Sequence, residues 1–559
     1  MKKLMTTTLS ALLSVTVLMT GCTQGKNTTD TDKRSTNAPA GEKGTDPTSE
    51  PKKDITVSVY DRGSVPAAEG TTEDNRWTKW LNESGPSNVK FVPIPRWESA
   101  QKLNVLFASG SAPDLIFEYN PVIMDTFYTQ KQLMPLDDLI EKHSTVYKNL
   151  LEQYPALRKV GTKSDGKLYS VARLASVQPI HGLLIRKDWL DKLGLEVPTT
   201  VEELLTVAKA FTEQDPDGNN ADDTYGISLS FKSQDVIQSF FNAYGINPAI
   251  PLVVENGELV ISWENQKLAV DYMKQIFEMG AADKDFLNDA NGAKAKQDFL
   301  NGKLGIYPNQ VGTYFDFAVN SLSVLKKNDP AAEVIPIAYP ASSKGSYNPA
   351  FTNPVQVTAY VNANAKNPDA VMKYIDFASE VSTGRKLGYG DDGTHHVIGE
   401  NGCPVVTDAD KFKNEVAYNG DLQMLVSGLL DVECGDPELK FNVNDPIQKE
   451  GLEMHRMAKE AYLDVNKPYP GITHPEHYPM LPEDLSLIMT GAIEAIQPIW
   501  YKSVLGGSSY TTDQAMQDAI MAWEKSGGKK VEDWYQDWYI NSKDTAFLAK
   551  DIYDMIETK

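Results

Sequence analysis

Short apolar stretches alternate with segments of helical spacing along the first part of the chain. Residues 55–60 alternate between apolar and polar positions as a strand does, residues 72–85 repeat apolar positions at helical spacing, and residues 89–94 predict a second strand. The same order of strand and helix continues through residues 99–150. Strands that alternate with helices favour a sheet with mainly parallel pairing, so the sequence predicts an α/β fold.

A second unit of the same kind begins near residue 164, and the chain is long enough for two or three domains. Its predicted strands are residues 181–186, 259–263, 302–307 and 334–337, and its predicted helices are residues 235–244 and 266–279. A strand at residues 355–362 and an amphipathic helix at residues 368–380 come next. The rest of the chain has mostly helical spacing.

The N-terminal residues have the order of a bacterial secretion signal. Two lysines precede an apolar run at residues 9–19, and Gly21 and Cys22 follow it. The run is shorter than the about 20 apolar residues of a spanning helix, so we expect residues 1–21 to be a removed signal. Gly before Cys resembles a lipobox, which makes Cys22 the expected lipidation site; simple secretion is the alternative. The polar residues 22–53 predict a flexible spacer.

Charge and cysteine content narrow the classes of partner. The formal net charge is −22, and a chain this acidic repels phosphate backbones, so we expect no nucleic-acid partner. The same balance slightly disfavours a polyanionic ligand, although a local basic cleft could override it. Beyond Cys22 the chain has only Cys403 and Cys434, which could form one disulfide or stay buried and reduced.

An acidic loop follows a predicted helix that begins with the capping box of Thr200 and Glu203. Within the loop, side chains with oxygen atoms recur at every second residue, a spacing that can turn them inward round one hard cation. The expected calcium ligands are the side chains of Asp215, Asp217, Asn219 and Asp223 and the backbone carbonyl of Ala221.

This loop departs from a true EF-hand at two diagnostic positions. Its sixth residue is Asn220 rather than Gly, and its twelfth is Gly226 rather than a bidentate Glu. Asn tolerates the left-handed conformation that the sixth position requires. A polar turn without an ion is the alternative interpretation.

Seven segments together carry a family resemblance. They are LNVLFASGSAPDLIFEY (103–119), LMPLDDLI (133–140), DGKLYSV (165–171), the stretch 184–227 around the acidic loop, NGKLGIY (301–307), NANAKNPDAVMKYIDF (362–377) and MAWEKSGGKKVEDWYQDWY (521–539). In order and number they resemble family 1 of the extracellular solute-binding proteins of ABC importers, closest to the large lipoprotein and alginate-binding type. The resemblance implies a two-lobed periplasmic-binding-protein-like fold of type II, with mixed sheets flanked by helices and a ligand cleft between the lobes.

The resemblance also implies how the chain divides between the lobes. Residues 54–175 and 308–378 are expected to form lobe 1, and residues 176–307 and 379–559 lobe 2, whose last part is helical. Alginate-binding relatives carry calcium in a loop like the acidic loop of this chain, so calcium is expected as a structural cofactor. Where the family often has Glu, this chain has Thr224. That change removes one charged ligand, and extracellular calcium modules function at about 0.1 to 1 mM.

An oligosaccharide is the expected ligand. Sugars offer apolar ring faces and many hydroxyls, so their sites combine flat aromatic rings with carboxylates and amides at the ring edges. In an α/β lobe such residues should lie at loop ends that follow strands. The candidates are Asp61, Arg62, Trp97, Glu118, Tyr119, Tyr314 and Phe315.

A receptor of this kind implies further partners. The resemblance implies a monomer on the outer face of the cell membrane, held by lipid, that delivers its ligand to two permease subunits driven by a cytoplasmic ATPase. A receptor for peptides or another non-sugar solute is the first alternative. A secreted polysaccharide-active enzyme is the second, but no local motif singles out a catalytic nucleophile or acid–base pair, so we expect no catalytic residues.

Overall fold

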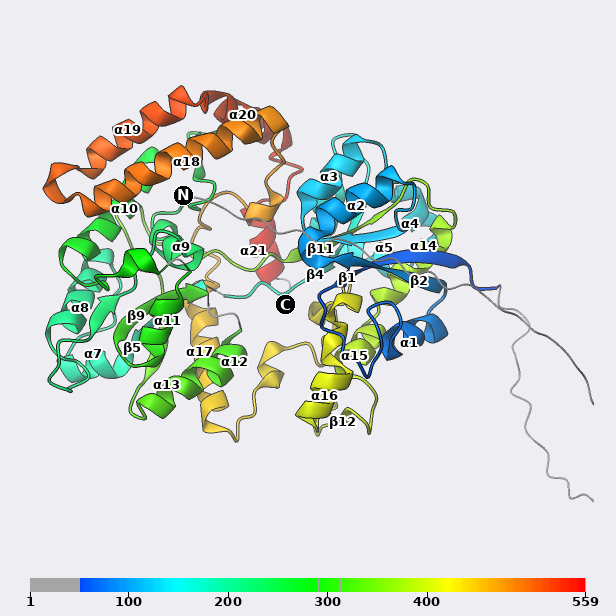
Figure 1. Cartoon of the computed structure of the whole chain (residues 1–559), viewed down its shortest axis with the longest axis horizontal. Coiled ribbons are helices and arrows are strands. Elements are labelled where there is room, and N and C mark those ends of the chain that lie inside the picture. Colours follow the sequence, from blue (N-terminus) through cyan, green and yellow to red (C-terminus); the bar gives the residue numbers. More distant parts are fainter. Residues whose placement is uncertain (1–50, 180, 290, 311–312, 558–559) are drawn as a thin grey trace, which may run out of the picture. The chain divides into compact units, whose positions relative to one another are not determined.

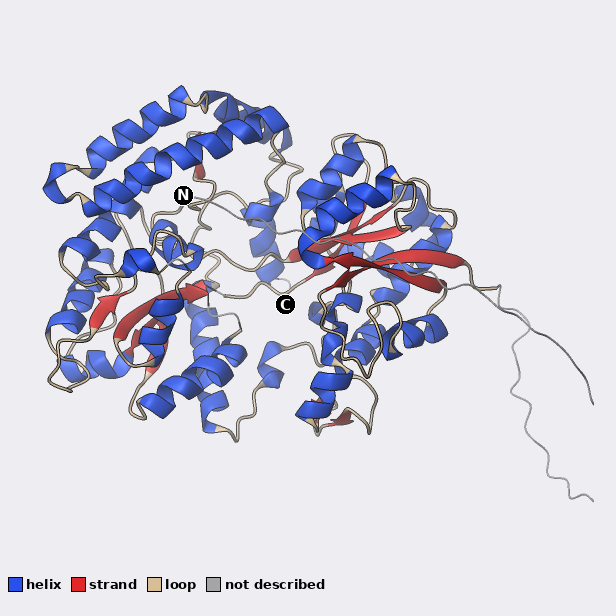
Figure 2. Ribbon diagram, viewed as in Figure 1, coloured by secondary structure: helices blue, strands red, loops and turns tan. Residues whose placement is uncertain are grey.

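The computed structural model describes residues 51–179, 181–289, 291–310 and 313–557. The predicted signal, Cys22 and nearly all of the predicted spacer lie outside these residues. From Lys52 onward the chain forms one compact unit that contains two main sheets, each with its own hydrophobic core. Figure 2 shows both sheets as red strands surrounded by blue helices. The predicted two-lobed α/β fold with mixed sheets is therefore confirmed.

The first sheet has the strand order β2-β1-β3-β11-β4. Strand β1 pairs in parallel with β2 and β3, whereas β11 is antiparallel to both β3 and β4. Helices α2 and α3 lie on one face of this sheet, and α1 and α15 lie on the other (Figure 1). The strands are β1 (Asp54–Asp61), β2 (Asn88–Pro95), β3 (Leu115–Glu118), β4 (Ser170–Leu174) and β11 (Val355–Val361).

Helices from both ends of the chain bury the first sheet's core. They are α1 (Arg76–Ser84), α2 (Ser99–Ala108), α3 (Pro121–Thr129), α4 (Asp137–His143), α5 (Val146–Gln153), α6 (Pro155–Gly161), α14 (Pro368–Ala378), α15 (Val381–Tyr389), α16 (Ala409–Glu415) and α21 (Ala549–Glu557). A small hairpin of β12 (His396–Ile398) and β13 (Pro404–Val406) follows α15.

The second sheet has the order β10-β5-β9-β6. Strand β5 is antiparallel to β10 and β9, and β6 is parallel to β9. The strands are β5 (His181–Arg186), β6 (Tyr225–Ile227), β9 (Leu304–Gln310) and β10 (Val334–Ile337), and a separate hairpin joins β7 (Leu252–Glu255) to β8 (Glu258–Ile261).

The helices of the second lobe pack in two neighbouring apolar clusters. They are α7 (Lys187–Leu193), α8 (Val201–Glu213), α9 (Gln234–Asn242), α10 (Trp263–Glu278), α11 (Ala293–Leu300), α12 (Tyr314–Phe317), α13 (Ser323–Asn328), α17 (Pro446–Tyr462), α18 (Glu483–Leu505), α19 (Thr512–Lys525) and α20 (Lys529–Ser542). Among the helices of the described residues, none is long and apolar enough to cross a membrane.

The packing of two segments differs from the predicted lobe boundaries. Strands β9 and β10 pair with β5, so the chain returns to the first sheet only at β11, later than residue 308. Within the predicted second part of lobe 2, Leu387, Val416, Met424 and Ile552 lie in the first sheet's core. An apolar strand pattern indicates burial but does not indicate which sheet the strand joins, which explains both differences.

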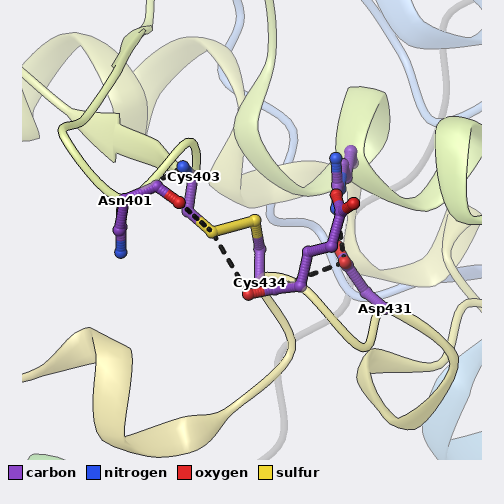
Figure 3. Close-up of a disulfide and its surroundings, with 6 residues drawn as sticks. Asn401, Cys403, Asp431 and Cys434 are labelled. Atoms are coloured by element: carbon purple, nitrogen blue, oxygen red, sulfur yellow. Dashed lines mark hydrogen bonds and ion pairs between the residues drawn. A yellow bond between two sulfur atoms is a disulfide. The ribbon is translucent and has the colours of Figure 1, made fainter.

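Cys403 and Cys434 form a disulfide, which settles the alternative that the sequence left open. Figure 3 shows the bridge beside Asn401 and Asp431. The backbone N–H of Cys434 donates a hydrogen bond to the Asp431 carboxylate. The Arg385 guanidinium donates to the same carboxylate at 2.5 Å. The bridge thus fixes two points of the segment that packs against the first core.

Candidate functional site

Aromatic and cationic side chains gather where the parallel strands β1, β2 and β3 end. We refer to Tyr60, Arg62, Arg96, Trp97 and Tyr119 as the aromatic rim. The rings of Tyr60 and Tyr119 stack with their centroids 5.6 Å apart and their planes at 10°. The carboxyl ends of parallel strands meet at one edge of a sheet, which is where α/β folds place ligands. The rim therefore lies at the expected edge of the first lobe.

Arg96 occupies the centre of the aromatic rim. It opens the short 3₁₀ helix η1 (Arg96–Glu98) directly after β2. Its guanidinium carbon lies 4.8 Å from the ring centroids of both Tyr60 and Tyr119 and 5.3 Å from that of Trp97. Its Nε is buried and has no hydrogen-bond partner among the described residues. Three cation–π contacts thus position this cation.

Arg62 is held differently, by a carboxylate from a distant part of the chain. Its Nε donates to both carboxylate oxygens of Asp421, at 2.8 and 3.1 Å. Asp421 belongs to the 3₁₀ helix η4 (Ala417–Leu422), which packs beside β1. These hydrogen bonds raise the pKa of Arg62. Arg62 also lies 5.8 Å from the Tyr60 ring and 6.0 Å from the Trp97 ring, so it fixes one side of the rim.

Trp97 and Glu118 lie at opposite extremes of exposure. Trp97 is 82% exposed, whereas Glu118 is completely buried. Glu118 accepts a hydrogen bond from the backbone N–H of Asn120 at 2.9 Å. Burial raises the pKa of Tyr60, and the Glu118 carboxylate raises it further. Glu118 is therefore a buried partner of Tyr60, and Trp97 presents its indole to solvent.

The remaining candidates from the sequence are Asp61, which lies in a surface turn, and Tyr314 and Phe315, which pack in the second lobe. The carboxylate of Asp61 accepts hydrogen bonds at 3.0 Å from the Gly63 backbone and the Thr72 hydroxyl, in an exposed turn after β1. Tyr314 is 1% exposed within a core cluster of the second lobe. Phe315 packs edge-on against Phe441, with centroids 5.5 Å apart. The structure does not bring Tyr314 or Phe315 to the aromatic rim.

The acidic loop gathers its side chains around an amide. The Asn219 side-chain nitrogen donates to Asp217 at 2.8 Å and to Asp223 at 3.0 Å, while the Ala221 N–H donates to the Asn219 side-chain oxygen. The Asp215 carboxylate accepts backbone N–H groups of the turn at 3.1 Å. The loop thus forms a compact, hydrogen-bonded polar turn.

The same loop crowds negative charge. Burial raises the pKa of Asp217, and the carboxylates of Asp215 and Asp223 raise it further against the lowering effect of the Asn219 N–H. Lys303 pairs with Asp223 at 3.2 Å. Within the part of the chain that the structure describes, no group of three or more His, Cys, Asp and Glu side chains is arranged to hold a metal ion. Side-chain geometry alone therefore does not show the expected calcium site.

A cavity that the sequence did not identify lies in the second lobe. A cavity of about 350 Å³ lies between α9, α10, α18 and α19. Its wall is mainly apolar, with the glutamines 234, 266 and 497 as polar exceptions. We refer to it as the apolar cavity; its larger side chains include Phe231, Phe241, Trp263, Met489, Trp500 and Trp523.

Comparisons with known proteins agree on the fold, and the similar proteins are solute-binding proteins. The sequence profile of the bacterial extracellular solute-binding proteins matches residues 78–381. The polygalacturonan/rhamnogalacturonan-binding protein YtcQ of Bacillus subtilis is 27% identical over 488 residues, which cover 84% of this chain and 89% of that protein. The fructooligosaccharide ABC transporter substrate-binding protein FusA of Streptococcus pneumoniae is 29% identical over 324 residues, 54% of this chain and 57% of that protein.

Solved structures resemble the chain over most of its length. A solute-binding protein from Bifidobacterium longum infantis, described as HMO-binding and ABC-transporter-associated, superposes with a TM-score of 0.66 at 20% identity, over 88% of this chain and 99% of that one. An EF-hand mutant of FusA in complex with fructo-nystose superposes with a TM-score of 0.60 at 19% identity, over 88% and 99%. At these identities the structures establish the fold.

Proposed function

We propose that this chain, which belongs to the bacterial extracellular solute-binding protein family, is a receptor that binds an oligosaccharide and delivers it to an ABC importer. The sugar ligands named for YtcQ and FusA support this class of ligand. The observation that carries the proposal is the aromatic rim, because flat rings with charged groups at their edges suit sugar rings. Members of this family bind their ligands and do not transform them.

Within the rim, each side chain has a distinct part in binding. Trp97 is exposed and stacks on the apolar face of a sugar ring, and Tyr119 extends that surface. Arg62 and Asp61 lie at the edges, where their polar groups reach sugar hydroxyls. Glu118 acts indirectly by holding Tyr60 through a side-chain hydrogen bond. Tyr314 and Phe315 are not part of the aromatic rim, since Tyr314 is buried in a core cluster of the second lobe and Phe315 packs against that cluster.

Delivery requires a change that the importer can recognise. Ligand binding favours a closed arrangement of the two lobes, and the closed form docks on two permease subunits driven by a cytoplasmic ATPase. Lipid at Cys22 would hold this monomeric receptor on the outer face of the membrane. Replacing Cys22 with alanine should release the protein into the medium; retention of that variant on the cell would contradict the anchor.

We also propose calcium as a structural cofactor of the acidic loop. The oxygen-rich donor set suits a hard cation, and the crowded carboxylates of Asp215, Asp217 and Asp223 would be relieved by a bound positive charge. Asn219 and the Ala221 carbonyl complete the proposed ligand set. Thr224 is not available to it, since its hydroxyl donates to the Phe211 carbonyl at 2.9 Å. The ion would stiffen the turn and stand apart from ligand binding.

Calorimetry against a panel of soluble oligosaccharides and peptides tests the function. Saturable heat with one or more oligosaccharides, and an unchanged oligosaccharide after prolonged incubation, is the expected result. A response to peptides alone would favour the non-sugar alternative. Release of shortened products would show that the protein is an enzyme and would contradict the proposed receptor function. Trp97→Ala should weaken the sugar response without loss of folding, because Trp97 is 82% exposed.

A further inference from the structure

Arg96 differs from Arg62, Arg76 and Arg385 of the first lobe in the partner that holds it. Arg62, Arg76 and Arg385 are each paired with a carboxylate at 2.8 Å or closer. Arg96 forms no ion pair with any residue of the described segments and is held by three aromatic rings instead. Its Nε is removed from solvent without a hydrogen bond. A half-buried guanidinium in this state has an unused capacity for an anion.

We propose that Arg96 receives the carboxylate of a uronic acid residue, so that the ligand is an acidic oligosaccharide. This inference rests on the proposed function and specifies its substrate class. A sugar ring stacked on Trp97 would lie beside Arg96, because the guanidinium carbon is 5.3 Å from the centroid of the indole. A guanidinium and a carboxylate make short, charge-assisted hydrogen bonds, about twice as strong as neutral ones. The rings orient the cation in advance, which lowers the entropy lost on binding.

The acidity of the whole chain does not oppose this ligand. Exposed charges farther away than about 8 Å are largely screened at physiological ionic strength, so the charge of −22 acts weakly at the rim. Within the rim, Asp421 is already paired with Arg62, and Asp61 accepts hydrogen bonds from its own turn. Glu118 is completely buried. Arg96 is thus the rim's cation without an ion-pair partner in the described chain.

Neutral and acidic forms of one oligosaccharide test the proposal directly. Calorimetry would compare oligogalacturonates with the same oligosaccharides after methyl esterification, which removes the charge and keeps the backbone. The acidic form should bind at least tenfold more tightly, and its affinity should fall as salt is raised. Arg96→Gln should abolish both the preference and the salt dependence, and Arg96→Lys should retain part of each. Arg158→Gln is the matched control, since it removes an exposed, paired arginine on α6.

The outcomes separate this inference from the proposed function. Equal or tighter binding of the neutral form, or an unchanged acid preference in Arg96→Gln, would overturn the role of Arg96 and leave an oligosaccharide receptor in place. If neither form bound while other oligosaccharides did, the acidic class would be excluded. If no oligosaccharide of either kind bound, the proposed function itself would fail. If Arg96→Gln does not fold, the salt dependence of the unaltered protein and the affinity of the Arg96→Lys variant still test the role of Arg96.

Discussion

The aromatic rim and the apolar cavity contain similar rings in opposite roles. In the rim, Trp97 is 82% exposed and the neighbouring rings contact two arginines. In the cavity, Trp500 is 6% exposed and Phe231 stacks on Tyr501 with centroids 4.2 Å apart. The cavity is lined mainly by carbon, whereas the rim contains two arginines beside its rings. The proposed sugar site therefore rests on exposed rings beside charged groups and not on pocket volume.

The two regions differ in how much apolar surface they expose to water. An exposed indole gains by covering itself with a sugar, since apolar surface then leaves water. Several large side chains around the cavity, Trp500 and Trp523 among them, are already buried, and their contribution is to the stability of the second lobe. Sugar hydroxyls need hydrogen-bond partners that the cavity wall offers mainly through glutamines 234, 266 and 497. We therefore expect rim substitutions to change affinity and cavity substitutions to change stability.

Trp500→Ala should have the largest effect. Truncating a buried Trp costs about 3–5 kcal/mol, and Trp500 belongs to the second lobe's core. Chemical denaturation should show this loss of unfolding free energy, with sugar affinity unchanged at temperatures where the variant is folded. Trp97→Ala is the matched control and should unfold as the unaltered protein does. Loss of affinity in folded Trp500→Ala would assign the cavity to the ligand.

Removal of the disulfide should lower the stability of the first lobe, which contains the aromatic rim. The bridge closes a segment across a separation of 31 residues, for which chain entropy predicts a loss of about 2–4 kcal/mol. Asp421 and Met424 belong to this segment, so the double variant Cys403→Ser/Cys434→Ser should also loosen the support of Arg62 and Tyr119. Reductant added to the unaltered protein is the control. Equal melting temperatures with and without the bridge would contradict the expected stabilisation.

The sequence predicted local caps and turns better than it predicted which distant segments pack together. The capping box of Thr200 and Glu203 is present, and Asn220 adopts φ 59°, as the turn requires. Both depend on residues close in sequence. Trp263, in contrast, was assigned to a strand and begins α10, because an apolar run alone does not distinguish a strand end from a helix start.

The candidate site was predictable only in part, for the same reason. Position after a strand selects Trp97 and Tyr119, which the structure places in the aromatic rim, and the same rule selects Tyr314, which is buried in the second lobe. Arg96 was not predicted, because Tyr60 and Tyr119 lie at the ends of other strands, and spacing along the chain does not show which strand ends meet. Asp421 lies 359 residues from Arg62, and no local pattern connects them.

Trp97→Ala should weaken oligosaccharide binding by about 1–2 kcal/mol, roughly five- to thirtyfold, because the ring loses both burial and stacking on the ligand. Calorimetry would measure the change, with the melting temperature of the free protein unaltered. Leu487→Ala on α18 is the control, since Leu487 is 69% exposed and lies outside the rim. Equal effects of the two variants would remove the distinction between the rim and any other exposed apolar surface.

Calcium should have the smallest effect and should act on neither region directly. A site with a dissociation constant of about 0.1–1 mM stabilises the folded state by about 0.4–1.4 kcal/mol at 1 mM calcium. Differential scanning calorimetry should show a higher melting temperature with calcium than with chelator. Asp217→Asn should remove this difference, and Asp138→Asn, an exposed acid on α4, should preserve it. Sugar affinity should stay constant throughout, because the loop supports the second lobe and the ligand stacks on the first. A chelator that weakened sugar binding without lowering stability would instead connect the ion to the rim.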